Sequence, residues 1–459
     1  MLNCPESRCV IVNFFGYAAL AVLGWGAVMT SVEAATLYGP VLGDSEMSQI
    51  KVWVQTDAAA EVKLVYRSQK AVGTLAVRSP QTLTLSTQAQ QDFVQVFELT
   101  DLQPGTSYDY TLWVNGEEVK RPHPFSFFTA PYWQKRSDPP SFTFALGSCA
   151  YINDPAISGS TSGGDYGIFQ QIYEKKPEMM LWMGDNIYFM PPDFYSRAGM
   201  SKRYQQSRAV KELQPLFANV PQYATWDDHD YGGDNGDRTY RMREASLATF
   251  KNYWPNPSFG LPEVPGVFTR FEKSDVEFFL TDNRYHRAPN TFADPQRDFF
   301  GEGQWQWLKE SLSSSRATFK FVVLGNETLN TLTPSENMYQ YTQAYADFLG
   351  WLEKSKIPGI VLLSGDRHHT ELLKLERAGT YPLYEWCVSP LTSKAYAPYP
   401  VEQNLPIRVP GSLYSERNFG MIEVSGPPAD RQLVLKRYNT QGKENWRFVI
   451  RAKDLIPKQ

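Results

Sequence analysis

The stretch Trp226-Asp227-Asp228-His229-Asp230 places three carboxyl groups and one imidazole directly after the short, largely apolar run 223–226. Buried carboxylates repel one another, and each loses the solvation that stabilises its charge. Such a cluster is therefore stable inside a protein only when a cation lies among the charges, and a metal ion is the simplest candidate. The stretch predicts a metal centre at the end of a strand.

Three other strand-like runs end in residues of the same kind. The apolar runs 142–146, 179–183 and 360–364 are followed by Cys149, by Asp185 and Tyr188, and by Asp366 and His368, respectively. One aspartate after a strand would mean little, because aspartate is also a common turn residue. Sites in open α/β sheets form outside the carboxyl ends of the strands. We therefore expect these side chains and Asp228 to converge on one metal site.

The pattern after residue 141 alternates between strands and helices. Strand-like runs occur at 142–146, 179–183, 222–225, 276–281, 319–324 and 360–363, and helical patterns occur at 166–175, 202–219, from 303 onward and at 344–354. This alternation predicts a layered α/β domain, a β-sandwich with flanking helices, over residues 141–459. Two later runs, 420–424 and 433–437, are expected to be antiparallel strands that close one side.

The segment 36–130 has a different pattern. Short runs with strand alternation at 50–54, 62–66, 93–97 and 108–114 are separated by turn signals, and no helical pattern lies between them. This predicts a small all-β sandwich domain, and the string 102–110 resembles the matching segment of fibronectin type III-like domains. The polar, proline-bearing segment 131–140 is expected to be the linker. A chain of 459 residues is also long for a single core.

The N-terminus reads as a targeting segment. Arg8 precedes an apolar run at 10–29, and Val32 and Ala34 fit the small-residue pattern of a signal-peptidase site. Residues 1–35 are therefore expected to be a signal peptide. The apolar run is close to membrane-spanning length, so an uncleaved membrane anchor is the alternative. In either case the sequence predicts an exported protein. It would be periplasmic or secreted if the segment is cleaved, and membrane-anchored if it is not.

Composition and cysteine content narrow the possible functions. A net charge of −4 gives no reason to expect specific nucleic-acid binding, so a phosphate group would be attracted locally by metals or arginines. The chain has no P-loop and no Gly-x-Ser-x-Gly elbow. Outside the leader only Cys149 and Cys387 remain. A disulfide is the default for such a pair in an oxidising compartment, but the strand-end position of Cys149 also suits a metal ligand.

The order of the motifs resembles one family. A cysteine at the first strand end, Gly-Asp-x-x-Tyr at the second, Trp-Asp-Asp-His-Asp at the third and Gly-Asp-x-His at the last are similar to the alkaline phosphatase D (PhoD-like) family. That family is a divergent branch of the calcineurin-like metallophosphoesterases, and the resemblance spans about residues 141–425. It implies an exported metal-dependent phosphoester hydrolase that uses a metal-activated hydroxide. Its substrates would be small-molecule or polymeric phosphomonoesters, phosphodiesters or both.

The resemblance also implies which residues hold two or more metal ions. Asp185 matches a bridging carboxylate, whose two oxygens can bind two ions. Cys149, Tyr188 and His368 match the ligands of one ion. Thiolate, phenolate and imidazole together suit iron or another transition metal.

A second ion is implied at Asp228 and Asp366. Carboxylate oxygens suit calcium or another hard divalent ion such as manganese or magnesium. More typical calcineurin-like enzymes carry Asn and His at these two positions, so the second site of this chain is more anionic. Asn326, which follows the run 319–324, is a further candidate ligand.

Two residues have implied catalytic roles, each with an alternative. His229 matches a residue that donates a proton to the leaving alcohol, and the alternative is a buried orienting histidine. Arg284, which follows the run 276–281, matches an arginine that could bind phosphate oxygens in a bidentate manner, and the alternative is an ion pair with a site aspartate. The rival for the whole chain is a non-catalytic, calcium-stabilised envelope binding protein, which gives no role to His229, His368 and Cys149.

Overall fold

The computed structural model describes residues 36–69, 79–154, 162–335 and 337–458 of the 459-residue chain. The predicted signal peptide or anchor, residues 1–35, lies outside the described residues and stays a prediction. Within the described ranges, none of the helices combines the length and the apolar character needed to cross a bilayer. Residues Ala35–Gln459 form one compact unit.

The first part of this unit is all β, as expected. Its strands are β1 (Leu37–Ser45), β2 (Ile50–Thr56), β3 (Glu61–Ser68), β4 (Gln81–Ser86), β5 (Val94–Leu99), β6 (Ser107–Val114), β7 (Glu117–Glu118) and β8 (Ser126–Phe128). They form two sheets, one in the order β1-β2-β5 and one in the order β4-β3-β6-β7 with β8 paired to β6. Alternate residues of β6 are buried, which is the period-two pattern that the sequence showed. The hairpin between β6 and β7 turns at Asn115 and Gly116.

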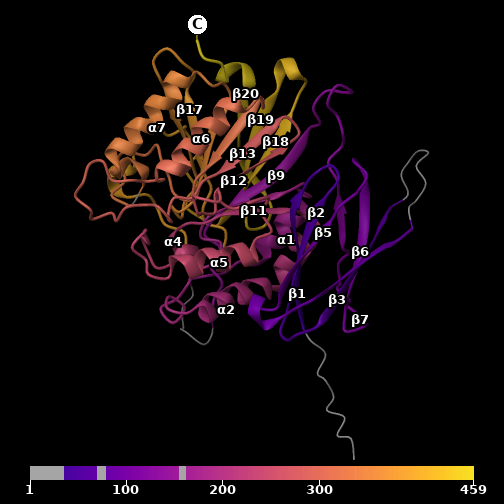
Figure 1. The fold of residues 1–459 in the computed structure, drawn as a ribbon. Coiled ribbons are helices and arrows are strands. Elements are labelled where there is room, and N and C mark those ends of the chain that lie inside the picture. Colours follow the sequence, from indigo (N-terminus) through magenta and orange to yellow (C-terminus); the bar gives the residue numbers. More distant parts are fainter. Residues whose placement is uncertain (1–35, 70–78, 155–161, 336, 459) are drawn as a thin grey trace, which may run out of the picture. The chain divides into compact units, whose positions relative to one another are not determined.

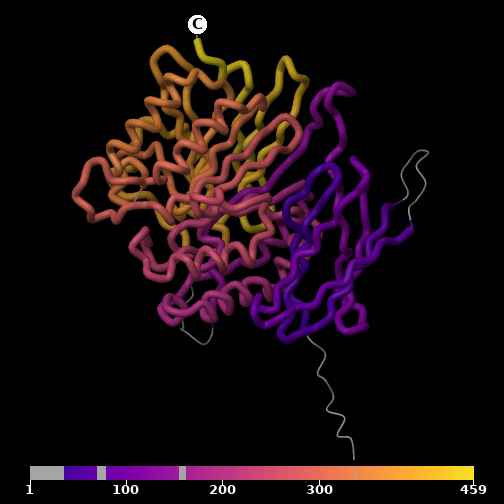
Figure 2. The backbone as a smooth tube through the Cα atoms, viewed as in Figure 1, coloured from indigo at the N-terminus to yellow at the C-terminus, as the bar shows by residue number. Residues whose placement is uncertain are grey.

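The second part contains two six-stranded mixed sheets. One sheet has the order β11-β10-β9-β18-β19-β20, with β9 (Phe142–Gly147), β10 (Met180–Met183), β11 (Gln222–Thr225), β18 (Asn418–Ser425), β19 (Gln432–Asn439) and β20 (Glu444–Arg451). The other has the order β12-β13-β14-β15-β17-β16, with β12 (Thr269–Lys273), β13 (Val276–Leu280), β14 (Phe319–Val323), β15 (Ile360–Ser364), β16 (Glu371–Leu375) and β17 (Leu383–Cys387). Strand β18 pairs antiparallel with β9, so the C-terminal part of the chain returns to the strand that opens this region, a path that can be followed in Figure 2.

Helices cover the outer faces of both sheets (Figure 1). They are α1 (Gly167–Glu174), α2 (Arg197–Arg208), α3 (Gln214–Asn219), α4 (Asp228–Tyr231), α5 (Arg243–Tyr253), α6 (Glu302–Ser314) and α7 (Thr342–Ser355). Alternate strand residues explain the layers. Phe321 and Val323 of β14 belong to the apolar cluster between the sheets, whereas Val322 joins Leu308 of α6 and Leu352 of α7 in an outer cluster. The predicted layered β-sandwich with flanking helices is thus confirmed.

The predictions differ from the structure in a few elements. The single helix expected at 202–219 is two helices, α2 and α3, with Pro215 in the first turn of α3. Proline has no amide hydrogen and fits the start of a helix, so it begins a new helix here. Strands β1, β4, β12, β16, β17 and β20 had no clear signal in the sequence pattern.

The all-β region packs directly on the α/β region. Trp53 of β2 is fully buried, and its indole Nε1 donates a hydrogen bond of 2.8 Å to the carbonyl of Asn252 in α5. The Tyr110 hydroxyl of β6 donates to the carbonyl of Ala218 in α3 at 2.8 Å. The two regions therefore share a core and do not meet only through the segment predicted to be a linker.

One buried carboxyl group at this contact predicts a pH effect. Asp44 of β1 is 4% exposed, and burial raises its pKa from the ordinary 3.8 to about 6. The folded chain therefore holds this proton at a pH where the unfolded chain has lost it, so this group lowers stability as pH rises from about 4 through 6. We expect Asp44→Asn to raise the free energy of unfolding at about pH 8 by up to about 3 kcal/mol, with little gain near pH 4.

The measurement is urea unfolding of both proteins at the two pH values. Glu98→Gln, which removes an exposed carboxyl group from the same region, is the control and should behave like the parent at both. A gain for Asp44→Asn that is equal at the two pH values would show that ionisation of Asp44 is not its cause.

Candidate metal centre

Strand ends deliver the predicted ligands to one place. Strands β9, β10 and β11 pair in parallel, and β13, β14 and β15 do the same in the other sheet. The carboxyl ends of each set therefore meet at one edge. Cys149 follows β9, Asp185 and Tyr188 follow β10, Asp228 begins α4 after β11, and Asp366 and His368 follow β15.

The first expected ligand group is compact. The thiol of Cys149 lies 3.6 Å from Asp185 Oδ2, and the Tyr188 hydroxyl lies 3.1 Å from the same oxygen. The Tyr188 hydroxyl is also 3.2 Å from His368 Nε2. One ligand atom from each of Cys149, Asp185 and His368 lies within 4.8 Å of the others, so a single ion could contact all of them.

A second group shares a residue with the first. Ligand atoms of Asp185, Asp228 and His229 also lie within 4.8 Å of one another. Asp366 lines the same cavity. Asp185 thus belongs to both groups, which is the arrangement that a bridging carboxylate requires.

The electrostatics of the groups indicate that a cation belongs there. Burial and the neighbouring Asp228 and Cys149 raise the pKa of Asp185 well above its ordinary value. Burial raises the pKa of the Cys149 thiol to about 12. A bound metal ion would lower these pKa values, because it stabilises the thiolate, phenolate and carboxylate forms directly. The donor set of thiol, phenol, imidazole and carboxyl groups therefore fits a metal ion, and these residues could hold one.

The backbone at the ligands is unusual. Cys149, Asp185, Asp366 and His368 have positive φ angles of 58°, 51°, 71° and 54°. This left-handed conformation is uncommon for residues other than glycine and costs roughly 1–3 kcal/mol at each position. It turns each chain sharply just beyond its strand, which brings the side chains inward.

Close approach of the strand ends depends on a glycine. A Cβ atom at Gly365 would lie 2.5 Å from the Cβ of Ser148 and 2.6 Å from the carbonyl oxygen of Met183. Both distances are far below van der Waals contact. Gly365 is therefore the residue that lets the end of β15 meet the ends of β9 and β10.

Arg284 forms an ion pair with a buried aspartate. It is fully buried, and its Nε lies 2.6 Å and its Nη2 2.5 Å from Asp227 Oδ1. Its Nη2 is 3.9 Å from Asp228 Oδ1. Burial alone would raise the pKa of Asp228, but the neighbouring His229 and Arg284 lower it by more, so that this pKa lies below its ordinary value. The geometry thus favours the ion-pair alternative for Arg284 over a phosphate clamp.

The three carboxyl groups of the stretch 226–230 make different contacts. Asp227 pairs with Arg284, and Asp230 accepts the amide of Asp227 at 2.7 Å and the side chain of Asn186 at 2.6 Å. Asp228 lines the cavity together with His229. Two of the three carboxyl groups are therefore held by an ion pair or by hydrogen bonds within the protein, and Asp228 is the one that lines the cavity where a cation could bind.

Asn326 lies in the layer behind Asp227. Its Oδ1 accepts a hydrogen bond of 2.8 Å from Asn283 Nδ2, which also donates to Asp227 Oδ1 at 2.9 Å. Asn326 is fully buried and is not among the residues that line the cavity. Its contacts are those of a residue that positions Asp227, and no contact joins it to either ligand group.

The two cysteines are buried thiols that are not joined to each other. Ser389 Oγ donates to Cys149 Sγ at 3.1 Å. The thiol of Cys387 donates to the carbonyl of Gly365 at 3.1 Å. Of the two alternatives for Cys149, the structure therefore carries the ligand position and not the disulfide.

The cavity at the ligand groups has a volume of about 550 Å³. Besides Asp185, Tyr188, Asp228, Asp366 and His368, its lining includes His229, Asp234, Tyr151, Lys394, Tyr396 and Tyr399. The loop after β17 supplies the last three of these, as well as Ser389. Sequence reasoning missed this loop because β17 has no separate strand signal and the loop carries no acidic cluster.

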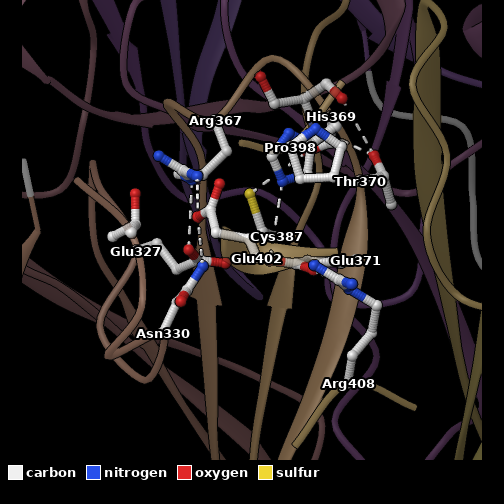
Figure 3. Close-up of polar contacts among 12 residues, drawn as sticks. Glu327, Asn330, Arg367, His369, Thr370, Glu371, Cys387, Pro398, Glu402 and Arg408 are labelled. Carbon is white, nitrogen blue, oxygen red and sulfur yellow. Dashed lines mark hydrogen bonds and ion pairs between the residues drawn. The ribbon is translucent and has the colours of Figure 1, made fainter. Parts of the chain in front are cut away.

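An ionic network lies beside the ligands (Figure 3). Arg367, between the ligand positions 366 and 368, pairs with Glu402 and lies 3.3 Å from Glu327 Oε2. Glu402 is fully buried, accepts a hydrogen bond of 2.8 Å from Asn330 Nδ2, and accepts the amide of Tyr399 at 2.7 Å. This carboxylate therefore connects the β15 end to the loop that lines the cavity.

Comparison with known proteins gives the family. The model of PhoD-like phosphatases matches residues 144–430. This chain belongs to the PhoD-like phosphatase family. Residues 33–131 match a domain of unknown function (DUF7800). Alkaline phosphatase D of Bacillus subtilis (strain 168) is 22% identical over 279 residues, which is 50% of this chain and 46% of that protein. The match thus spans less than half of that relative's length.

Solved structures show the same fold. A structure of PhoD matches with a TM-score of 0.74 at 17% identity, and the match covers 91% of this chain and 90% of that one. The purple acid phosphatase PPD1 from yellow lupin (Lupinus luteus) seeds matches with a TM-score of 0.65 at 12% identity over 92% of this chain and 76% of that chain. The metallophosphoesterase-like fold expected from the motifs is confirmed.

The buried carboxylate of Glu402 gives a stability test. Removal of one partner from a buried ion pair costs about 3–5 kcal/mol, because the other charge stays buried. We expect Glu402→Ala to lower the free energy of unfolding by this amount, and Glu402→Gln by less, since its amide oxygen can still accept the Tyr399 amide. Urea unfolding is the measurement. Glu376→Gln, at a carboxylate whose side chain is 71% exposed, is the control and should change stability by under about 1 kcal/mol. Similar losses at the two positions would contradict the structural role of Glu402.

Proposed function

We propose that this chain is an exported, metal-dependent phosphoester hydrolase of the alkaline phosphatase or phosphodiesterase type. The observation that carries the proposal is the sharing of Asp185 by two ligand groups in one cavity. Membership of the PhoD-like phosphatase family and the name of the Bacillus relative support it. Its substrate would be a small-molecule or polymeric phosphoester. Export would follow from the predicted leader, with a periplasmic or secreted protein if residues 1–35 are cleaved and a membrane-anchored one if they are not.

Two or more metal ions would be bound. Cys149, Tyr188 and His368 would hold iron or another transition ion, because thiolate, phenolate and imidazole are soft or intermediate donors. Asp228 and Asp366 would hold calcium or another hard divalent ion. Asp185 would bridge the two ions. In place of the predicted ligand role, Asn326 would position Asp227 through Asn283.

Bound ions of this kind supply an activated water molecule at neutral pH and neutralise charge on the phosphate. The residues of the chain position the reaction. His229 lines the cavity, and its ring lies 4.4 Å from that of Tyr188 between centroids. It would give a proton to the leaving alcohol. Arg284 would act through Asp227 and Asp228, which it holds in place, and not by contact with the substrate.

The buried thiol of Cys149 and the half-buried imidazole of His368 weigh against the rival function. Structural calcium is bound by oxygen atoms. A calcium-stabilised binding protein would have no use for Cys149 and His368 within 4.8 Å of Asp185. The hydrolase therefore accounts for more of the side chains in the cavity.

Hydrolysis tests the site assignment. Asp185→Asn keeps the shape of the side chain and removes the charge shared by both groups. We expect it to lower the hydrolysis of 4-nitrophenyl phosphate and bis(4-nitrophenyl) phosphate by more than about 100-fold. Asp165→Asn, a change at a side chain that is 53% exposed and outside the cavity lining, is the control. Activity of Asp185→Asn near that of the control would show that the site lies elsewhere.

The role of His229 can be separated from simple orientation. Poor leaving groups need a proton more than good ones, and general acid catalysis is worth about 10²–10⁴-fold. His229→Asn should therefore slow the hydrolysis of alkyl phosphates much more than that of 4-nitrophenyl esters, measured as kcat/KM. An equal loss on both kinds of ester would favour the orienting role.

Metal content tests the thiol ligand without an activity assay. We expect Cys149→Ser to lose the transition metal while it keeps the ion held by carboxylates, as measured by elemental analysis of the purified protein. Cys387→Ser is the matched control, because this second buried thiol contacts backbone carbonyls and no ligand group. Unchanged transition-metal content in Cys149→Ser would remove Cys149 from the ligand set.

A further inference from the structure

Two tyrosines form a wall of the cavity that the proposed hydrolysis does not use. Tyr396 and Tyr399 are 52% and 48% exposed, and both line the cavity together with Asp366 and His368. Half-exposed aromatic rings beside a reacting centre are suited to stack on a ligand, since a ring carries a large apolar face at low entropic cost.

Tyr396 is fixed to a ligand residue. Its ring stacks on the imidazole of His368 with 5.1 Å between centroids and an interplanar angle of 18°. Its amide donates to the carbonyl of His368 at 2.9 Å. His368 Nδ1 in turn lies 2.5 Å from the carbonyl oxygen of Lys394. The segment is thus bonded to His368 at both of these residues.

Tyr399 is fixed by the ionic network. Its amide donates to Glu402, whose carboxylate pairs with Arg367. Figure 3 shows Arg367 and Glu402 facing one another, with Pro398 of the same loop nearby. Because buried groups hold the loop in place, binding at the two rings would require little ordering of the protein.

The cavity is larger than a phosphate group requires. Its volume of about 550 Å³ lies within the range of about 300–1,000 Å³ that is typical of sites for small organic molecules. A phosphate group next to Asp185 and Asp228 would leave space toward the two rings. The organic part of the ester would occupy that space.

We propose, on the basis of the hydrolase function proposed above, that Tyr396 and Tyr399 form a subsite for the alcohol part of the phosphoester. The subsite selects alcohols that carry a flat, unsaturated ring. Such a ring stacks on the exposed tyrosine faces, while a saturated ring of similar size does not fit them as well. The Lys394 ammonium lies over the Tyr396 ring, 5.5 Å from the ring centroid.

Phosphonates test the subsite without turnover, because their P–C bond resists hydrolysis. Benzylphosphonate, cyclohexylmethylphosphonate and ethylphosphonate are titrated into the metal-loaded protein by calorimetry. We expect the benzyl compound to bind at least about fivefold more tightly than the cyclohexylmethyl compound. Tyr396→Ala and Tyr399→Ala should remove this preference, and Tyr396→Phe should keep it. Tyr195→Ala, at a ring that is 61% exposed outside the cavity lining, is the matched control and should also keep it.

Hydrolysis separates this proposal from the one on which it rests. The esters are benzyl and ethyl phosphate, together with dibenzyl and diethyl phosphate, whose leaving groups are all primary alcohols. A higher kcat/KM for the benzyl esters, reduced in Tyr396→Ala, would support the subsite. Hydrolysis of both kinds of ester without ring preference, or equal binding of the three phosphonates, would overturn the subsite alone. Hydrolysis of none of these four esters and of neither 4-nitrophenyl ester would overturn both proposals.

Discussion

The burial of several carboxyl groups where strand ends from two sheets meet is the constraint on which the site depends. The chain meets it in two ways. Arg284 neutralises Asp227 from within the protein, at 2.5 Å. Around Asp185 the chain instead gathers other possible metal ligands, and burial together with the neighbouring Asp228 and Cys149 raises the pKa of Asp185 well above its ordinary value. The ion pair between Arg284 and Asp227 therefore stabilises the site from within the protein, and the proposed metal ions would neutralise the remaining carboxylates.

This division explains why the same residue types occur in two layers. Asp227, Asn283 and Asn326 form a hydrogen-bonded layer behind the cavity. Asp228, the next residue after Asp227, faces the cavity beside His229. Adjacent residues thus have opposite tasks, because α4 begins at Asp228 and the chain direction changes there. The loop after β17 adds a further set of contacts around His368, which fix the imidazole on the side away from Tyr188.

The fold and part of the site could be predicted because both leave local patterns. Short, largely apolar runs identified β10, β11 and β14, and the residues just beyond the strands identified Cys149 and Asp185. The remaining features depend on contacts between distant segments. Arg284 and Asp227 are separated by 57 positions, so no local pattern shows that they pair. The left-handed backbone at four candidate ligand positions also leaves no local pattern, since cysteine, aspartate and histidine all occur in many other conformations. Tyr396 and Tyr399 look like ordinary loop tyrosines until the cavity is known.

Burial of Trp53 beneath α5 has a consequence for how the molecule can be divided. The indole contacts Asn252 and Tyr253 at the end of that helix, and Ser246 in its first half lies 3.4 Å from the carbonyl oxygen of Asp230. The N-terminal sandwich thus supports α5, the helix that packs beside the turn at Asp228 and His229. A fragment that begins at residue 141 would lose this support, and the surface of α5 that Trp53 covers would be exposed to water. The N-terminal sandwich is therefore better regarded as a support for the candidate metal centre than as a separable domain.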